Sequence, residues 1–272
     1  MSGVPDPAYI AARRVLLDAL TALELHLDSI ILIGAQAVYM HAGEADIAVA
    51  PHTTDADLAL DTESLKEAPL IQVSMREAGF VNVYPGSWRG GEDVVIDLMV
   101  ADVQGGAGRR AARIPPHDKS VARKTLGLEG VLVDRGARTV IALDETDKRR
   151  FQIHVAGPAA LIIAKTIKVD ERRADPGRLR DKDALDIFRL LRAVDTQVIA
   201  ERMILIESDT RAKAVAMRTV DLLSDLFGSP DAVGCEMTVR ATAGLMDPDE
   251  VRASLVALAN DLLAALETLR GS

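Results

Sequence analysis

Residues 53–60 read TTDADLAL. This stretch decides the fold because polar residues at its start are followed by residues that alternate along the chain as they do in a half-buried strand. We expect a β-strand from Ala56 to Leu60. Asp55 and Asp57 are two residues apart, so on a strand both carboxylates project from the same face of a sheet. Such a pair alone is a weak signal, because acids at strand ends are usually solvated.

A third carboxylate lies inside residues 94–100, VVIDLMV, a β-prone run in which an apolar residue would pack better than Asp97. A half-buried carboxylate costs free energy unless it is paired or bound to a metal. Carboxylate oxygens are ligands that Mg²⁺ prefers, and a bound Mg²⁺ holds phosphate oxygens in turn. Three acids on neighbouring strands therefore predict a Mg²⁺ site.

One element upstream, residues 30–40, IILIGAQAVYM, predict an apolar strand that turns at Gly34 into a helix. The turn exposes backbone N–H groups at a helix N-terminus, which suits a phosphate group. A turn of this kind also serves packing alone. The position of this turn just before the acids favours a role in phosphate binding.

The rest of the chain predicts mixed structure followed by helices. We expect a helix over 7–27 capped by Asp6, a helix over 62–78 that Pro69 kinks or shifts, and an inserted loop over 41–52. Strands are predicted at 131–133 and 139–143, joined by a turn at 134–136, and at 151–155. Helices are predicted at 158–173, 181–193, 195–206, 210–227 and 248–269. The fold class is α+β (mixed), with a mixed-sheet domain over 1–156 and an α-helical domain over 157–272.

The net charge of −9 divides unevenly along the chain. Residues 1–100 hold 5 Lys and Arg against 15 Asp and Glu, residues 101–182 hold 18 against 11, and residues 183–272 hold 9 against 15. An acidic segment followed by a basic one can hold metal ions beside phosphates, although charge also fluctuates in blocks over any surface. Three arginines of the basic segment follow a glycine cluster and are candidates for phosphate contact: Arg109, Arg110 and Arg113.

Cysteine content and hydropathy bear on the compartment. Cys235 is the single cysteine, which excludes an internal disulfide and a multi-thiolate zinc site. No segment runs for ~18 apolar residues, and the first residues lack the basic start and apolar stretch of a secretory leader. We expect a cytoplasmic protein with no membrane partner.

The glycine turn, the Thr-Asp-x-Asp strand and the third strand aspartate, in this order, resemble the polymerase-beta type nucleotidyltransferase superfamily. Residues 161–191, LIIAKTIKVDERRADPGRLRDKDALDIFRLL, are similar to a second signature: an apolar helix with a lysine, an Arg-rich loop, and Lys-Asp-x-x-Asp opening another helix. This signature is that of the AbiEii-type toxin nucleotidyltransferases, including the MenT enzymes. Together the matches span residues 30–192.

The resemblance implies a role for each matching residue. Asp55, Asp57 and Asp97 would bind two Mg²⁺ ions, with Mn²⁺ as an alternative, and Asp97 would also help to deprotonate the acceptor. Nucleotide contacts are implied for Gly34, Ala35, Gln36, Lys165, Lys168 and Asp183. Lys165 and Asp186 join the three strand aspartates as implied catalytic residues.

Simpler interpretations stand beside these roles. Lys165 interrupts an apolar run, so it is either an edge residue whose charge reaches water or a charge placed for function. Asp183 and Asp186 also suit a helix start, because carboxylates interact favourably with the helix dipole there. If Lys165 contacts the triphosphate, Lys165→Ala should raise the KM for NTP and lower kcat with the fold intact.

The function that follows is Mg²⁺-dependent transfer of NMP from an NTP to an acceptor hydroxyl, with release of pyrophosphate. By resemblance the acceptor is tRNA, and the protein is the toxin of a toxin-antitoxin pair with a cognate antitoxin protein as partner. Two alternatives remain open. One is a small-molecule, aminoglycoside-like nucleotidyltransferase, and the other is a catalytically silent binding subunit of the same fold.

Overall fold

The computed structural model describes residues 6–43, 49–175, 177 and 180–271. Its contacts divide the chain into two compact units. The first comprises Met1–Ala37, Ala50–Leu128 and Arg135–Ala156, and the second comprises Val38–Val49, Glu129–Asp134 and Gly157–Ser272. The last boundary follows residue 156, where the sequence also predicts one. Two short segments from the first half of the chain belong to the second unit as well.

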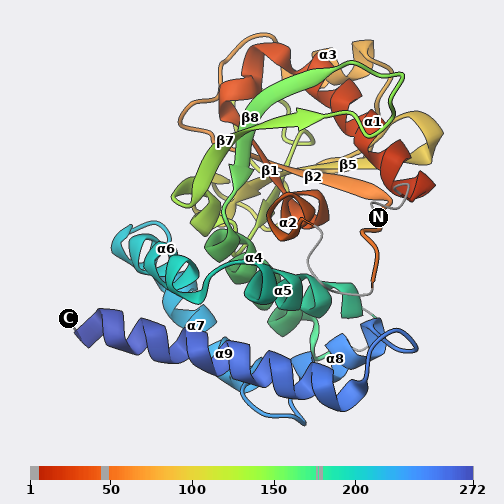
Figure 1. The fold of residues 1–272 in the computed structure, drawn as a ribbon. Coiled ribbons are helices and arrows are strands. Elements are labelled where there is room, and N and C mark those ends of the chain that lie inside the picture. The colour runs from red at the N-terminus through yellow and green to blue at the C-terminus, as the bar shows by residue number, and fades with distance from the viewer. Residues whose placement is uncertain (1–5, 44–48, 176, 178–179, 272) are drawn as a thin grey trace. The chain divides into compact units, whose positions relative to one another are not determined.

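The first unit is built on an eight-stranded mixed sheet (Figure 1). Its strands are β1 (Ile30–Ile33), β2 (Asp55–Leu60), β3 (Val81–Tyr84), β4 (Ser87–Arg89), β5 (Val95–Ala101), β6 (Arg123–Thr125), β7 (Arg135–Ile141) and β8 (Arg150–Ala156). The strand order is β3-β4-β5-β2-β1-β8-β7, and β6 pairs with β5. β2 therefore lies between β1, to which it is antiparallel, and β5, to which it is parallel.

Helices and short 3₁₀ turns connect these strands. They are α1 (Pro7–Ala22), η1 (Glu24–Ser29), α2 (Gly34–Ala42), α3 (Ile71–Glu77), η2 (Gly91–Asp93) and η3 (Asp102–Gln104). α1 begins where predicted, because Asp6 caps the N–H groups of Ala8 and Tyr9 and Pro7 occupies the first turn. It ends earlier than predicted, and η1 follows it. α1 packs against β2, β5 and β8 of the sheet.

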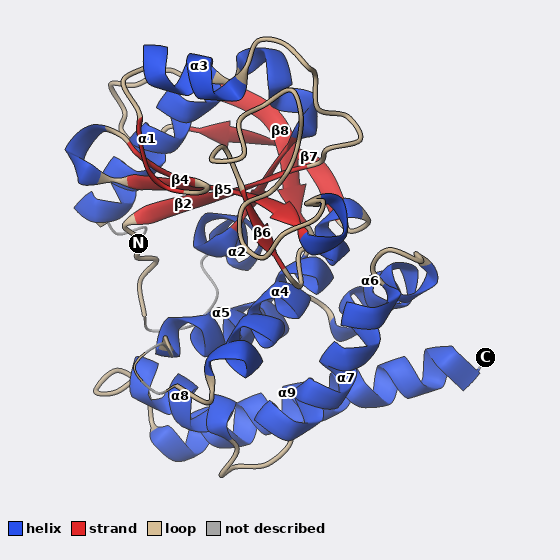
Figure 2. Cartoon of the chain, turned by 180° about the vertical axis from the view of Figure 1, so that it is seen from behind, coloured by secondary structure: helices blue, strands red, loops and turns tan. Residues whose placement is uncertain are grey.

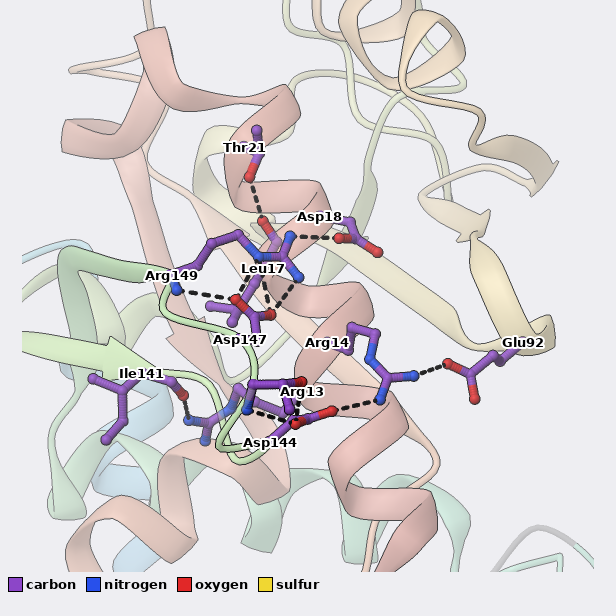
Figure 3. A network of polar contacts seen from close by, with 11 residues as sticks. Arg13, Arg14, Leu17, Asp18, Thr21, Glu92, Ile141, Asp144, Asp147 and Arg149 are labelled. Carbon is purple, nitrogen blue, oxygen red and sulfur yellow. Dashed lines mark hydrogen bonds and ion pairs between the residues drawn. The ribbon is translucent and has the colours of Figure 1, made fainter.

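Ion pairs connect α1 to the loop between β7 and β8 (Figure 3). Arg149 donates to Asp147 of its own loop and pairs with Asp18 on α1. Arg14 on α1 pairs with Asp144, at 3.1 Å between Nη2 and Oδ2, and with Glu92. These contacts fix the orientation of α1, whose inward side chains support the candidate site described below.

The predicted helix over 62–78 is wrong for its first half, since only Ile71–Glu77 is helical. Side chains from distant segments bind the carbonyls of the preceding loop. His26 Nε2 lies 2.8 Å from the Pro69 oxygen, and His117 Nε2 lies 2.9 Å from the Lys66 oxygen. His117 Nδ1 accepts the N–H of Ile71 at 3.2 Å, so the loop ends where α3 begins. Pro69 has no N–H for a helix, which leaves these tertiary bonds to decide the conformation.

The strand predicted at 139–143 lies largely in β7, but its predicted hairpin partner at 131–133 is wrong. Residues Glu129–Leu132 form a 3₁₀ turn, η4, and β7 begins at Arg135, within the predicted turn at 134–136, and pairs with β8. Asp134 is the reason, because it binds the start of α4 (Pro158–Arg172) instead. Its backbone oxygen accepts the N–H of Gly157 at 2.7 Å, and its carboxylate accepts the N–H of Ala160 at 3.1 Å.

The described part of the second unit contains helices packed on one another (Figure 2). They are α4 (Pro158–Arg172), α5 (Asp181–Ala193), α6 (Thr196–Ser208), α7 (Lys213–Phe227), α8 (Val233–Ala241) and α9 (Pro248–Gly271). α4 packs against α5, α6 and α7, and α9 packs against α6, α7 and α8. The sequence predicts five of these helices and misses α8. The α+β fold class is confirmed.

Two sequence expectations fall partly outside the described residues. The inserted loop predicted over 41–52 includes residues 44–48, and the Arg-rich loop includes 176, 178 and 179. The expectation about the first residues of the chain also falls in part on residues 1–5, which lie outside the described residues. Among the residues that the structure does describe, no helix is long and apolar enough to cross a membrane.

Candidate functional site

Two neighbouring strands carry three aspartates on one face of the sheet. Asp55 and Asp57 are two residues apart on β2, and the parallel register with β5 sets Asp57 directly beside Asp97. Side chains at i and i+2 share a face, and so do register partners on adjacent strands. Ala56, which separates the two acids of β2, and its register partner Ile96 on β5 are buried on the opposite face. The structure thus has the three acids on neighbouring strands, as the sequence predicts.

The glycine turn lies directly against the middle acid. Gly34 follows β1 and begins α2 with a φ of +68°, a conformation that favours glycine. A Cβ atom at this position would lie 2.1 Å from Oδ2 of Asp57. The register of β1 with β2 pairs Ile33 with Asp57, which brings the turn to the carboxylate. Glycine is required here both for its backbone conformation and for the space that Asp57 occupies.

Gln36, on the first turn of α2, is buried and supports the site from behind. Its Oε1 accepts a hydrogen bond from Arg13 Nε at 2.7 Å, and its Nε2 donates to the backbone oxygen of Asp55 at 3.2 Å. Arg13 in turn donates to the backbone oxygen of Ile141 at 2.8 Å (Figure 3). The sequence predicts a nucleotide contact for Gln36, and the structure gives its amide two protein partners. Ala35, predicted in the same role, is buried.

The outer two acids have protein partners of their own. Thr53 Oγ1 donates to Oδ1 of Asp55 at 2.7 Å. At Asp97, the hydroxyl of Ser87 donates to Oδ1 and Nη1 of Arg123 donates to Oδ2 at 2.7 Å. The Asp97 side chain is 19% exposed and that of Arg123 is 28% exposed. Both oxygens of the predicted third metal ligand therefore have protein donors.

Carboxylate oxygens are the type of ligand that a hard divalent cation prefers. Within the described residues, however, no three Asp, Glu, His or Cys side chains gather as a group that could hold a metal ion. Asp97 faces a guanidinium group instead, so an internal cation takes the place of an external one at this oxygen.

The remaining predicted residues form a charge cluster inside the second unit. Lys165 Nζ on α4 lies 2.9 Å from Asp183 Oδ1 and 2.7 Å from Asp186 Oδ2, both on α5. Lys168, one turn after Lys165, also lies 2.9 Å from Asp183 Oδ1. The other oxygen of Asp186, Oδ1, is buried and has no hydrogen-bond partner. The spacing of i and i+3 on both helices brings these residues together, as the sequence motif implies.

Burial and charge act in opposite directions in this cluster. Burial alone would lower the pKa of Lys165, but the carboxylates of Asp186 and Asp183 outweigh it and raise that pKa above its ordinary value. Burial alone would raise the pKa of Asp183, and the two lysines lower it instead. Lys165 and Asp183 therefore stay charged at neutral pH. Removing Lys165 would leave two buried carboxylates uncompensated, so the expectation that Lys165→Ala leaves the fold intact conflicts with its burial.

Compared with known proteins, the chain matches no family model, no curated protein and no solved structure. The geometry of the two groups of residues therefore carries the functional argument.

A basic loop in the first unit pairs with β6, the strand beside β5. Arg109, Arg110 and Arg113, which we call the arginine loop, are exposed, and within the described residues none of their guanidinium groups has an ion-pair or hydrogen-bond partner. The loop backbone is tied down by Lys124, whose Nζ donates to the oxygens of Gly106 at 3.0 Å and Gly108 at 3.2 Å. By contrast, Arg149, in the loop between β7 and β8, is neutralised by Asp147 and Asp18 (Figure 3).

Sequence reasoning missed Arg123 and Ser87, which hold the carboxylate of Asp97. β4 and β6 are strands of three residues each, too short for an alternating pattern to show. The signal that was available is the unexplained acid itself, since a carboxylate inside an apolar strand requires a partner. That signal predicts a cation near Asp97 without saying which one.

Proposed function

We propose that the chain is a nucleotidyltransferase that moves a nucleoside monophosphate from an NTP to an acceptor hydroxyl. The observation that carries the proposal is the set of Asp55, Asp57 and Asp97 on adjacent strands of one sheet face. Three carboxylates contribute nothing to apolar packing, and they repel one another unless cations lie among them. The Gly34 turn against Asp57 supports the proposal, because it brings backbone N–H groups at a helix start close to the acids.

In the proposed reaction, the acceptor oxygen attacks the α-phosphorus of the NTP and forms a new P–O bond. The bond from the α-phosphorus to the oxygen that bridges to the β-phosphate breaks, and pyrophosphate leaves with that electron pair. Asp97 is proposed to help accept the hydroxyl proton. Asp55, Asp57 and Asp97 would hold Mg²⁺, which supplies positive charge that stabilises the phosphate oxygens when bound.

The acceptor that we propose is an RNA, with tRNA as the candidate that the sequence resemblance names. The arginine loop supports an RNA acceptor, because exposed guanidinium groups without acid partners are suited to phosphate oxygens. Its backbone is fixed by Lys124, so little loop ordering is required on binding. A small-molecule acceptor would leave these arginines without a role.

The biological role that we propose is that of a toxin with a protein antitoxin, and this part rests on the resemblance of residues 161–191. Induced expression of the wild-type chain should arrest growth, and Asp57→Asn should not. Growth arrest by both chains would contradict a toxin that acts through nucleotidyl transfer.

The direct test is transfer of label from an NTP to total tRNA by the full chain. We expect transfer with Mg²⁺, none with EDTA, and a fall to background in Asp57→Asn, which preserves shape and removes the charge. Asp93→Asn is the matched control, because Asp93 lies in the same unit with its side chain 92% exposed. Transfer that survives EDTA or Asp57→Asn would overturn the proposal.

A further inference from the structure

The carboxylate of Asp97 is held by a cation of the protein itself. Arg123 Nη1 lies 2.7 Å from Oδ2, and the second amino nitrogen, Nη2, lies 3.4 Å from the sulfur of Met99. The hydroxyl of Ser87 donates to the other oxygen, Oδ1. Arg123 reaches Asp97 from β6, which pairs with β5 in a parallel register that sets Arg123 beside Met99.

Backbone hydrogen bonds hold the position of Arg123. β6 is hydrogen-bonded to β5, and Arg123 also forms a bridge with Ala111, which lies between the arginines of the arginine loop. Substituting the side chain removes none of these backbone bonds. A variant at position 123 therefore changes the charge beside Asp97 while the strand that carries it keeps its pairing.

Two cations cannot share Oδ2 of Asp97 without a penalty. Arg123 places the positive charge of its guanidinium group 2.7 Å from this oxygen. A divalent ion that approaches this oxygen meets a positive charge a few ångströms away, and the partial burial of both side chains weakens screening by water. The guanidinium group and a metal ion therefore compete for one carboxylate.

We propose that Arg123 is the built-in counter-cation of Asp97 and that it lowers the affinity of the three-aspartate site for divalent metal. The inference rests on the proposed function, because it takes Asp55, Asp57 and Asp97 as the metal-holding set. Arg123 acts through Asp97 and is thus a positioning residue. In the absence of metal it keeps the third carboxylate ordered and prevents charge repulsion with Asp57, its register neighbour.

The test is a titration of the full chain with Mn²⁺ alone, followed by electron paramagnetic resonance, without nucleotide. Arg123→Gln should lower the Kd for Mn²⁺ by about tenfold, because one positive charge beside the ligand oxygen is removed. Arg123→Lys keeps the charge and should stay within about twofold of the wild type. Ser87→Ala removes a neutral donor from the same carboxylate and should not tighten binding.

Two further variants complete the design. Asp57→Asn in the Arg123→Gln background should abolish the tight Mn²⁺ site, which shows that the ion lies at the three aspartates. Arg123→Met gives the same expectation as Arg123→Gln with an apolar side chain that can pack beside Met99, should the glutamine variant fail to fold. If the ion pair were purely structural and did not compete with metal, substitution of Arg123 would lower the thermal stability of the protein but would not raise its affinity for Mn²⁺.

The outcomes separate this inference from the proposed reaction. Mn²⁺ binding that is unchanged or weaker in both Arg123→Gln and Arg123→Met overturns the inference, even where label transfer to tRNA succeeds. Tighter Mn²⁺ binding that depends on Asp57, in a chain that transfers no label, supports the inference and overturns the proposed reaction. Absence of Mn²⁺ binding in every variant overturns the inference as well.

Discussion

Replacing Gly34 by alanine should damage the candidate site although it substitutes none of the charged residues there. The backbone at Gly34 has a φ of +68°, where an L side chain costs about 1–2 kcal/mol. The new Cβ would lie 2.1 Å from Oδ2 and 2.9 Å from Cβ of Asp57, so the carboxylate or the strand must move. Overpacking of this kind costs about 1–3 kcal/mol. The free energy of unfolding should therefore fall by about 2–5 kcal/mol.

Gly79→Ala separates the two contributions. Gly79 has a φ of +86°, and a Cβ atom there would have no neighbour within 4 Å. This variant should thus show the backbone cost of about 1–2 kcal/mol and nothing more. The difference between the two alanine variants measures the steric conflict with Asp57.

A double variant tests the steric conflict itself. In Gly34→Ala with Asp57→Ala the 2.1 Å contact with Oδ2 is removed and only the 2.9 Å contact with the Cβ of residue 57 remains. Urea denaturation should therefore show the double variant losing about 1–3 kcal/mol less than the sum of the two single variants. Gly34→Ala should also weaken Mn²⁺ binding, since Asp57 is displaced, whereas Gly79→Ala should not. Equal losses of stability in Gly34→Ala and Gly79→Ala, or strict additivity in the double variant, would refute the reasoning.

Three further predictions follow from the described structure. Lys165→Met should lower the free energy of unfolding by about 3–5 kcal/mol in urea denaturation, because it leaves buried carboxylates unpaired, and a loss under about 1 kcal/mol would contradict this. Replacing all three residues of the arginine loop by glutamine should weaken tRNA binding and reduce the slope of log K against log salt by about one for each phosphate that the loop no longer neutralises, and an unchanged slope would remove the RNA role. Burial lowers the pKa of His26 in the folded chain, so the unfolded chain binds more protons below the ordinary value of 6.5. Stability should be complete above that pH and fall as the pH drops toward the folded pKa, and His26→Gln should flatten this dependence between about pH 7 and 5.

The local sequence pattern was sufficient to predict a helix or strand wherever the buried residues recur with the period of that single element. The apolar run at 30–33 and the alternation at 56–60 predict β1 and β2 to within a residue, and the predicted helix at 181–193 has the bounds of α5. The same reasoning predicts the shared face of Asp55 and Asp57, because the period of a strand is fixed by covalent geometry. Their role as metal ligands stays a prediction.

Pattern failed where a distant side chain decides the backbone. Residues 62–70 have helical spacing, yet His26 and His117 bind their carbonyls and the helix begins only at Ile71. Residues 131–134 are β-prone, yet the carboxylate of Asp134 accepts the N–H of Ala160 in the first turn of α4, and the segment belongs to the second unit. A single sequence does not contain these long-range partners, since nothing local records which histidine or which helix start lies nearby.

Exposure distinguishes the two groups of charged residues as places for ligand exchange. In the second unit, the carboxylates of Asp183 and Asp186 are 4% and 1% exposed and share the ammonium group of Lys165. A ligand that used Lys165 would have to replace two short ion pairs in a dry environment, where each carboxylate left behind carries a large desolvation cost. In the first unit, Asp97 is 19% exposed and its partner Arg123 is 28% exposed, so water can solvate either one when they separate. Cation exchange at the sheet face is therefore less costly than at Lys165, and the first unit is the better place to look for metal and nucleotide binding. For Lys165 the same reasoning favours a structural contribution that its substitution should reveal as lost stability before any change in KM.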